Sequence, residues 1–188
     1  YDMYLKLLSE AVESSKAGGA DAPMEEDAEC LIDIAVDAHI PESYIDSVKN
    51  RLFMYKRIAC VKTKEDAQDV IDELIDRFGE PPKTVLGLID IALIRNRCIS
   101  LGIYEISQRG AVLLVYLQKI EPLSLAMLSK LMRGRVMISA AKTKPYLSVK
   151  LSDRTATQTL DEVLKILESA KNAEKKNAQS ETKEDSGE

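Results

Sequence analysis

The order of helical and strand-like patterns is the feature of this sequence that most restricts its fold. Apolar residues recur at helical spacing in three successive segments, from Pro41 to about Val61, from Thr63 to Gly79 and from about Lys83 to Leu101. Strand-like segments follow at 103–107, 111–118, 136–140 and 146–151, with a short helix from Pro122 and a last helix from about Thr157 to Ala170. Because helices and strands come in blocks, the sequence predicts an α+β fold, with helices packed on a small, mainly antiparallel sheet.

Prolines, glycines and one threonine mark the predicted boundaries of the first helices. Pro41 precedes an apolar helical stripe, and proline is favoured at the first position of a helix. Thr63 provides a hydroxyl that can cap the next helix. Gly79 is a suitable residue just past the end of that helix, and Pro81 and Pro82 prevent its continuation.

The ends of the chain differ in composition from its centre. Residues 1–15 have the spacing of an amphipathic helix, and residues 16–29 combine glycine, proline and acids as a flexible acidic linker does. A half-buried strand over 30–38 is predicted to begin the main domain, 30–170, because its apolar residues alternate. Residues 171–188 are almost without apolar side chains, so a disordered C-terminal tail is expected.

Charge and residue counts narrow the class of function. The chain has 31 acidic against 26 basic residues, a net charge of −5, which argues against a general nucleic-acid binder. Its three cysteines are far apart and are expected to be buried and reduced, as in the cytoplasm. Apolar runs are too short for a membrane span. We therefore expect a cytoplasmic protein with no membrane segment.

The search for catalytic groups finds no arrangement that the sequence supports. His39 is the single histidine, and neither a nucleophile-base set, a metal-ligand cluster nor a phosphate-binding loop accompanies it. We therefore predict a non-catalytic domain without cofactor or metal. A small enzyme built on paired carboxylates is the weakest of the alternatives that the sequence leaves open.

The first candidate surface lies at the end of the helix over 63–79. Positions three and four apart are neighbours on a helix, so Glu73, Asp76 and Arg77 are expected on its outward side, with Ile75 facing the core. Acids near a helix C-terminus oppose the helix dipole at a cost of about 0.3–1 kcal/mol. Such placement favours polar contact with a partner, and the alternative is a solvated helix end.

The second candidate surface is basic and lies on the helix expected after Pro41. Lys49, Lys56 and Arg57 either balance the acids of the chain or contact phosphates. Aromatic residues are few and scattered along the sequence, so a platform for stacking bases is not expected.

Two segments, in this order and spacing, carry a family resemblance. They are Asn50-Arg51-Leu52-Phe53-Met54-Tyr55-Lys56-Arg57-Ile58-Ala59, ahead of Thr63, and Glu73-Leu74-Ile75-Asp76-Arg77-Phe78-Gly79 with its prolines. Together they resemble the C-terminal domain family of bacterial transcription-repair coupling factors. Leu101-Gly102-Ile103 also fits, and Tyr1 to Val12 resembles the last helix of the preceding translocase module, so the resemblance covers roughly residues 1–120.

The resemblance implies a regulatory domain of a larger protein. That protein would be a double-stranded DNA translocase, with ATP and Mg as cofactors, that displaces stalled RNA polymerase and recruits UvrA in nucleotide excision repair. The domain would pack on the N-terminal UvrB-like module of the same chain and mask UvrA recruitment, with Glu73, Asp76 and Arg77 at the interface. The alternative is a DNA-contacting accessory module of the same motor that uses Lys49, Lys56 and Arg57.

Overall fold

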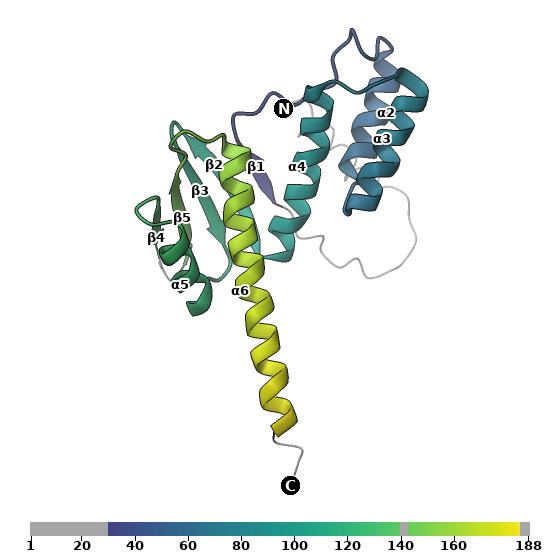
Figure 1. Ribbon diagram of the computed structural model, residues 1–188. Helices are drawn as coiled ribbons and strands as arrows, with labels where there is room; N and C mark the ends of the chain where they lie inside the picture. The colour runs from purple at the N-terminus through teal and green to yellow at the C-terminus, as the bar shows by residue number, and fades with distance from the viewer. Residues whose placement is uncertain (1–29, 140–142, 185–188) are drawn as a thin grey trace. The chain divides into compact units, whose positions relative to one another are not determined.

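The computed structural model describes residues 30–139 and 143–184, which form five helices and a five-stranded sheet (Figure 1). The predicted α+β class is confirmed. The described residues divide into two compact units, 36–96 and 30–35 together with 97–184. The helix and the linker that the sequence predicts over 1–15 and 16–29 lie outside the described residues.

The first unit contains α2 (Val48–Ala59), α3 (Lys64–Phe78) and most of α4 (Lys83–Ser100). Its core is apolar, and the buried side chains include Met54, Tyr55 and Ile58 of α2, Ala67, Val70 and Leu74 of α3, and Val85 and Leu88 of α4. The predicted start of α3 is confirmed, because the Thr63 hydroxyl accepts a hydrogen bond from the backbone N–H of Asp66. Gly79 follows α3 with a positive φ of 85°, which glycine adopts without strain.

The start of α2 is a correction to the sequence prediction. The helix begins at Val48 with Ser47 as its cap, whereas Pro41 belongs to a preceding turn. The buried Arg51 guanidinium donates hydrogen bonds to the backbone carbonyls of Ile45, at 2.7 Å, and Asp46, at 2.8 Å, just before the helix. Proline suits both a turn and a first helical position, so the sequence pattern does not separate the two cases.

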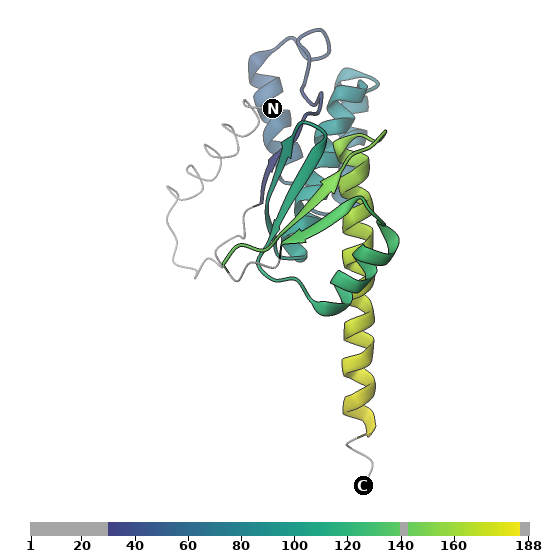
Figure 2. The ribbon, with the colours of Figure 1, turned by 90° about the vertical axis from the view of Figure 1, so that its left-hand side faces the viewer.

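The second unit is built on the sheet, in which the strand order is β1-β2-β3-β5-β4. The strands are β1 (Leu31–Asp33), β2 (Ile103–Arg109), β3 (Val112–Leu117), β4 (Val136–Ser139) and β5 (Tyr146–Lys150). β1 pairs parallel to β2, and every other pairing is antiparallel, as predicted. α6 (Ala156–Glu184) runs along one face of the sheet, and α5 (Pro122–Leu131) lies on the same side (Figure 2).

Burial alternates along β3 and β5. Leu113 and Val115 of β3 are buried, and so are Leu147 and Val149 of β5. β1 is shorter than the predicted strand over 30–38. The backbone N–H of Ala35 donates to the Gln108 side chain at 2.8 Å instead of to a neighbouring strand, so pairing stops after Asp33.

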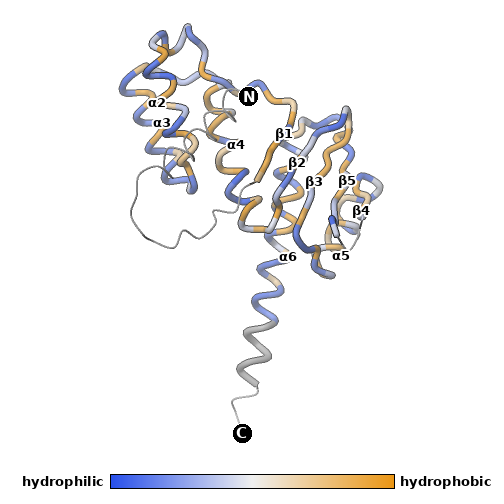
Figure 3. The backbone as a smooth tube through the Cα atoms, turned by 180° about the vertical axis from the view of Figure 1, so that it is seen from behind, coloured by the Kyte–Doolittle hydropathy of each residue, from blue (hydrophilic) through white to orange (hydrophobic). Residues whose placement is uncertain are grey.

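α6 is longer than the sequence predicts. Residues 171–184 are helical, in a region where low apolar content predicts a tail without secondary structure. Figure 3 colours the first turns of α6 beyond the sheet as mostly hydrophilic. Lysine, glutamate, glutamine and alanine are good helix formers, and extending an existing helix costs far less than nucleating one. The helix therefore continues past Ala170, where its apolar face ends.

Candidate functional site

Glu73 on α3 is held between two arginines. Its carboxylate accepts a hydrogen bond from Arg77, one turn later, at 2.8 Å, and another from Arg57 of α2 at 3.1 Å. Partial burial by itself would raise the pKa of Glu73, but hydrogen bonds from Arg77 and Arg57 outweigh it and keep that pKa below its ordinary value. Glu73 is therefore ionised at neutral pH and ties α3 to α2.

Arg77 connects the acidic end of α3 with apolar side chains. Its guanidinium lies 5.2 Å from the centre of the Phe53 ring and 4.9 Å from that of Phe78. Both distances are within the range of cation–π attraction. The Arg77 side chain is thus fixed by contacts on α2 and α3, although about a third of it, 35%, stays exposed.

Asp76 differs from its two predicted partners. It is exposed, and it makes no hydrogen bond or ion pair with any residue that the structure describes. The structure therefore brings Glu73 and Arg77 together and leaves Asp76 as an uncompensated carboxylate in the last turn of α3. Ile75 is a correction: it is 43% exposed, because the buried stripe of α3 is centred on Val70 and Leu74.

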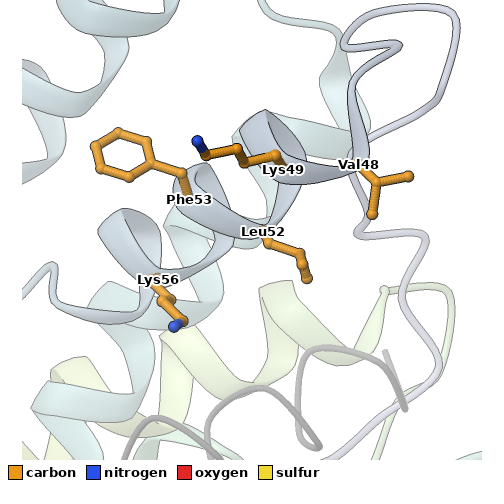
Figure 4. A pocket seen from close by; sticks show the side chains of 5 residues that line it. All are labelled: Val48, Lys49, Leu52, Phe53 and Lys56. Atoms are coloured by element: carbon orange, nitrogen blue, oxygen red, sulfur yellow. The ribbon is translucent and has the colours of Figure 1, made fainter.

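The predicted basic set divides into two parts. Arg57 belongs to the Glu73 cluster. Lys49 and Lys56 lie on the outer face of α2, where they line a shallow groove together with Val48, Leu52 and Phe53 (Figure 4). Neither lysine makes an ion pair with a residue in the described part of the chain. The two candidate surfaces therefore adjoin one another, since Phe53 borders both the groove and Arg77.

The comparison with known families decides the identity of this domain. Residues 34–128 match the TRCF domain family, and this range contains both candidate surfaces. The chain belongs to the TRCF domain family. It is 32% identical over 180 residues to the transcription-repair-coupling factor of Bacillus subtilis (strain 168), covering 93% of this chain and 15% of that protein. It is 29% identical over 161 residues to that of Staphylococcus epidermidis (strain RP62A), covering 78% and 14%.

The fold of this TRCF domain is also that of a solved relative. It superimposes on the crystal structure of a C-terminal domain of transcription-repair coupling factor with a TM-score of 0.67 and 19% identity. The match covers 78% of this chain and 96% of the other chain. The chain spans about 15% of the length of the Bacillus subtilis relative.

Two of the three cysteines of the TRCF domain, Cys30 and Cys98, lie next to each other in the second unit. His39 Nδ1 lies 3.0 Å from Asp37 Oδ1, and both side chains are exposed. Cys30 and Cys98 are buried as predicted, but Cys60 is exposed, which corrects the expectation for all three. Over 30–139 and 143–184, no group of three or more histidine, cysteine or acidic residues could hold a metal ion. Nor does any helix there have the length and apolarity to cross a membrane.

Three tyrosines form a cluster of the TRCF domain that the sequence pattern did not reveal. Tyr104, Tyr116 and Tyr146 lie on β2, β3 and β5, with ring centres 6.2 and 5.5 Å apart. The strand register aligns Tyr116 with Tyr146, and this register is not apparent from spacing along the chain. The half-buried rings contact one another across strands, an arrangement that stabilises a sheet.

Proposed function

We propose that this TRCF domain is a non-catalytic regulatory domain of a transcription-repair coupling factor. In this proposal it packs on the N-terminal UvrB-like module of the same protein and masks the surface that recruits UvrA. The whole protein would be an ATP-dependent, double-stranded DNA translocase that removes stalled RNA polymerase in transcription-coupled nucleotide excision repair. The domain would act in the cytoplasm as a lock that the motor releases.

The observation that carries this proposal is the uncompensated Asp76 beside the ordered pair of Glu73 and Arg77. Asp76 is exposed in the last turn of α3, where a negative charge is disfavoured by the helix dipole. Arg77 is already held in place by Glu73 and by two aromatic rings, so less conformational entropy is lost when a partner binds it. Contacts between domains of one chain are commonly polar and reversible, as a lock requires.

The test is charge reversal at Asp76 in the full-length coupling factor, with affinity for UvrA as the readout. Asp76→Lys should open the closed state and raise UvrA affinity by roughly 5- to 150-fold, the usual range of coupling between sites. Asp153→Lys is the matched control. It makes the same change of charge at an exposed position of the other unit.

Reversal at Glu73 is a weaker test. A lysine at that position would repel Arg57 and Arg77, so the domain itself would be disturbed. The double reversal of Glu73 and Asp76 should nevertheless also expose UvrA binding. If UvrA affinity is unchanged in both Asp76→Lys and the double variant, the lock does not exist in this form.

The alternative is a DNA-contacting accessory module of the same motor. Its support is the pair of lysines on α2, Lys49 and Lys56. Because Arg57 already binds the Glu73 carboxylate at 3.1 Å, it is less available to a phosphate than the two lysines are. The geometry therefore favours the regulatory role.

A further inference from the structure

The outer face of α2 is a stripe of exposed apolar side chains with a lysine toward each end. Val48 is 61% and Phe53 46% exposed, and Leu52 is half-buried between them. With Lys49 and Lys56 they line the groove shown in Figure 4. Their spacing along α2 places all five on one side of the helix. A stripe of this kind is a candidate for contact with a partner.

The charge on this face is positive and unbalanced. α2 contains four cations and no acid. Arg51 is paired with Glu42 at 2.9 Å and Arg57 with Glu73 at 3.1 Å. Lys49 and Lys56 make no such pair within the described ranges. Seven positions separate them, so they stand about 10 Å apart along the helix axis.

We propose that this face docks an acidic segment of the N-terminal UvrB-like module that carries an apolar side chain between carboxylates. The inference rests on the proposed function and extends its interface from α3 onto α2. The two surfaces are continuous, because the Arg77 guanidinium lies over the Phe53 ring. Phe53 is an aromatic anchor at the centre, and the lysine stems lie along apolar surface while their ammonium groups meet the carboxylates.

A protein segment fits this face better than a phosphate backbone does. Two separate lysines neutralise at most two phosphates, whereas duplex binding usually draws on a larger basic set. Exposed Val48 and Phe53 gain nothing from phosphates but are stabilised by an apolar partner. A net charge of −5 for the chain also disfavours approach to nucleic acid.

The first test is zero-length carbodiimide coupling in the full-length coupling factor, followed by mass spectrometry of the joined peptides. This chemistry links a lysine only to a carboxylate in direct contact with it. We expect Lys49 or Lys56 to be joined to an aspartate or glutamate of the N-terminal module. Coupling only to other modules or to a second copy, or no coupling of either lysine, would overturn the inference.

The second test compares two double variants with the same change of charge. Lys49→Glu with Lys56→Glu should raise the UvrA affinity of the full-length protein at least fivefold. Lys144→Glu with Lys150→Glu, at exposed positions of the other unit, should leave it unchanged. Thermal midpoints within about 2 °C of the parent would show that the fold is intact, as expected for surface changes.

The outcomes separate this inference from the proposed function. If Asp76→Lys opens the protein and the α2 variant does not, the contact on α2 is wrong and the regulatory role stands. When neither variant changes UvrA affinity, both are wrong. Should the α2 variant leave UvrA binding unchanged but weaken duplex binding with a steep salt dependence, the face contacts phosphates instead.

Discussion

At the residue scale, the carboxylate of Asp66 shows how one side chain fixes the beginning of an element. It accepts hydrogen bonds from the backbone N–H groups of Lys62 and Thr63, at 3.0 and 2.9 Å. The Thr63 hydroxyl in return accepts one from the N–H of Asp66 at 3.1 Å. This reciprocal capping box satisfies donors that the first turn of α3 would otherwise leave without partners.

Asp66 makes the stability of the domain depend on pH. The backbone hydrogen bonds from Lys62 and Thr63 hold the pKa of this carboxyl below its ordinary value. A group whose pKa is lowered by folding stabilises the fold above its unfolded pKa, about 3.9, and loses that contribution as pH falls through the folded pKa. NMR titration of the Asp66 carboxyl should therefore give a value below about 3.9.

Thr63→Ala is the control for the Asp66 titration. It removes the hydroxyl but keeps both backbone donors, so most of the lowering should persist. An ordinary pKa for Asp66 in the unmutated protein would contradict the capping geometry. Asp66→Asn should make unfolding by urea less sensitive to pH between about 5 and 3, around the ordinary pKa of aspartate.

At the element scale, the sequence predicted those helices and strands that local signals define. Thr63 and Gly79 delimit α3, Pro122 begins α5, and the turn at Gly110 joins β2 to β3 as expected. The errors arise where a side chain binds backbone just outside an element. Arg51 donates to the Ile45 carbonyl before α2, and Gln108 accepts from the Ala35 N–H after β1. The hydrophobic pattern of the sequence shows neither contact.

Arg97 joins the last turn of α4 to α6 within the second unit. Its guanidinium donates to Glu168 at 2.7 and 3.0 Å and to Asp161 at 2.7 Å. These hydrogen bonds, first of all the one with Glu168, raise the pKa of Arg97. The paired nitrogen and oxygen atoms match the fork of an arginine, a geometry that lysine does not reproduce.

Substitution of Arg97 should therefore separate charge from geometry. Arg97→Ala should lower the free energy of unfolding by about 1–2 kcal/mol, between the values typical of exposed and buried ion pairs. Arg97→Lys should recover only part of that loss in urea denaturation. If Arg97→Lys is as stable as the parent, the paired geometry with Glu168 contributes nothing.

At the scale of the whole molecule, both candidate surfaces belong to one unit. Asp76, Arg77 and the groove on α2 all lie within residues 36–96, and the family match at 34–128 contains this unit completely. The sequence alone predicts that Glu73, Asp76 and Arg77 lie together at the end of α3. The contact of Arg77 with Phe53 joins this group to the groove on α2. It depends on how α2 packs against α3, which the sequence pattern does not show.

A closed state held by Asp76, Lys49 and Lys56 should weaken as salt rises, because exposed charges are screened over about 8 Å at 0.15 M ionic strength and about 3 Å at 1 M. The full-length coupling factor and a variant that lacks this domain should therefore differ most in UvrA affinity at low salt. Their affinity ratio should approach one as salt increases from about 0.05 to 0.5 M. Taking the ratio removes the salt dependence of UvrA binding itself, which both proteins share. A ratio that stays constant over this range would mean that the closed state is held by apolar contacts, and Phe53 rather than Asp76 would then be the residue to substitute.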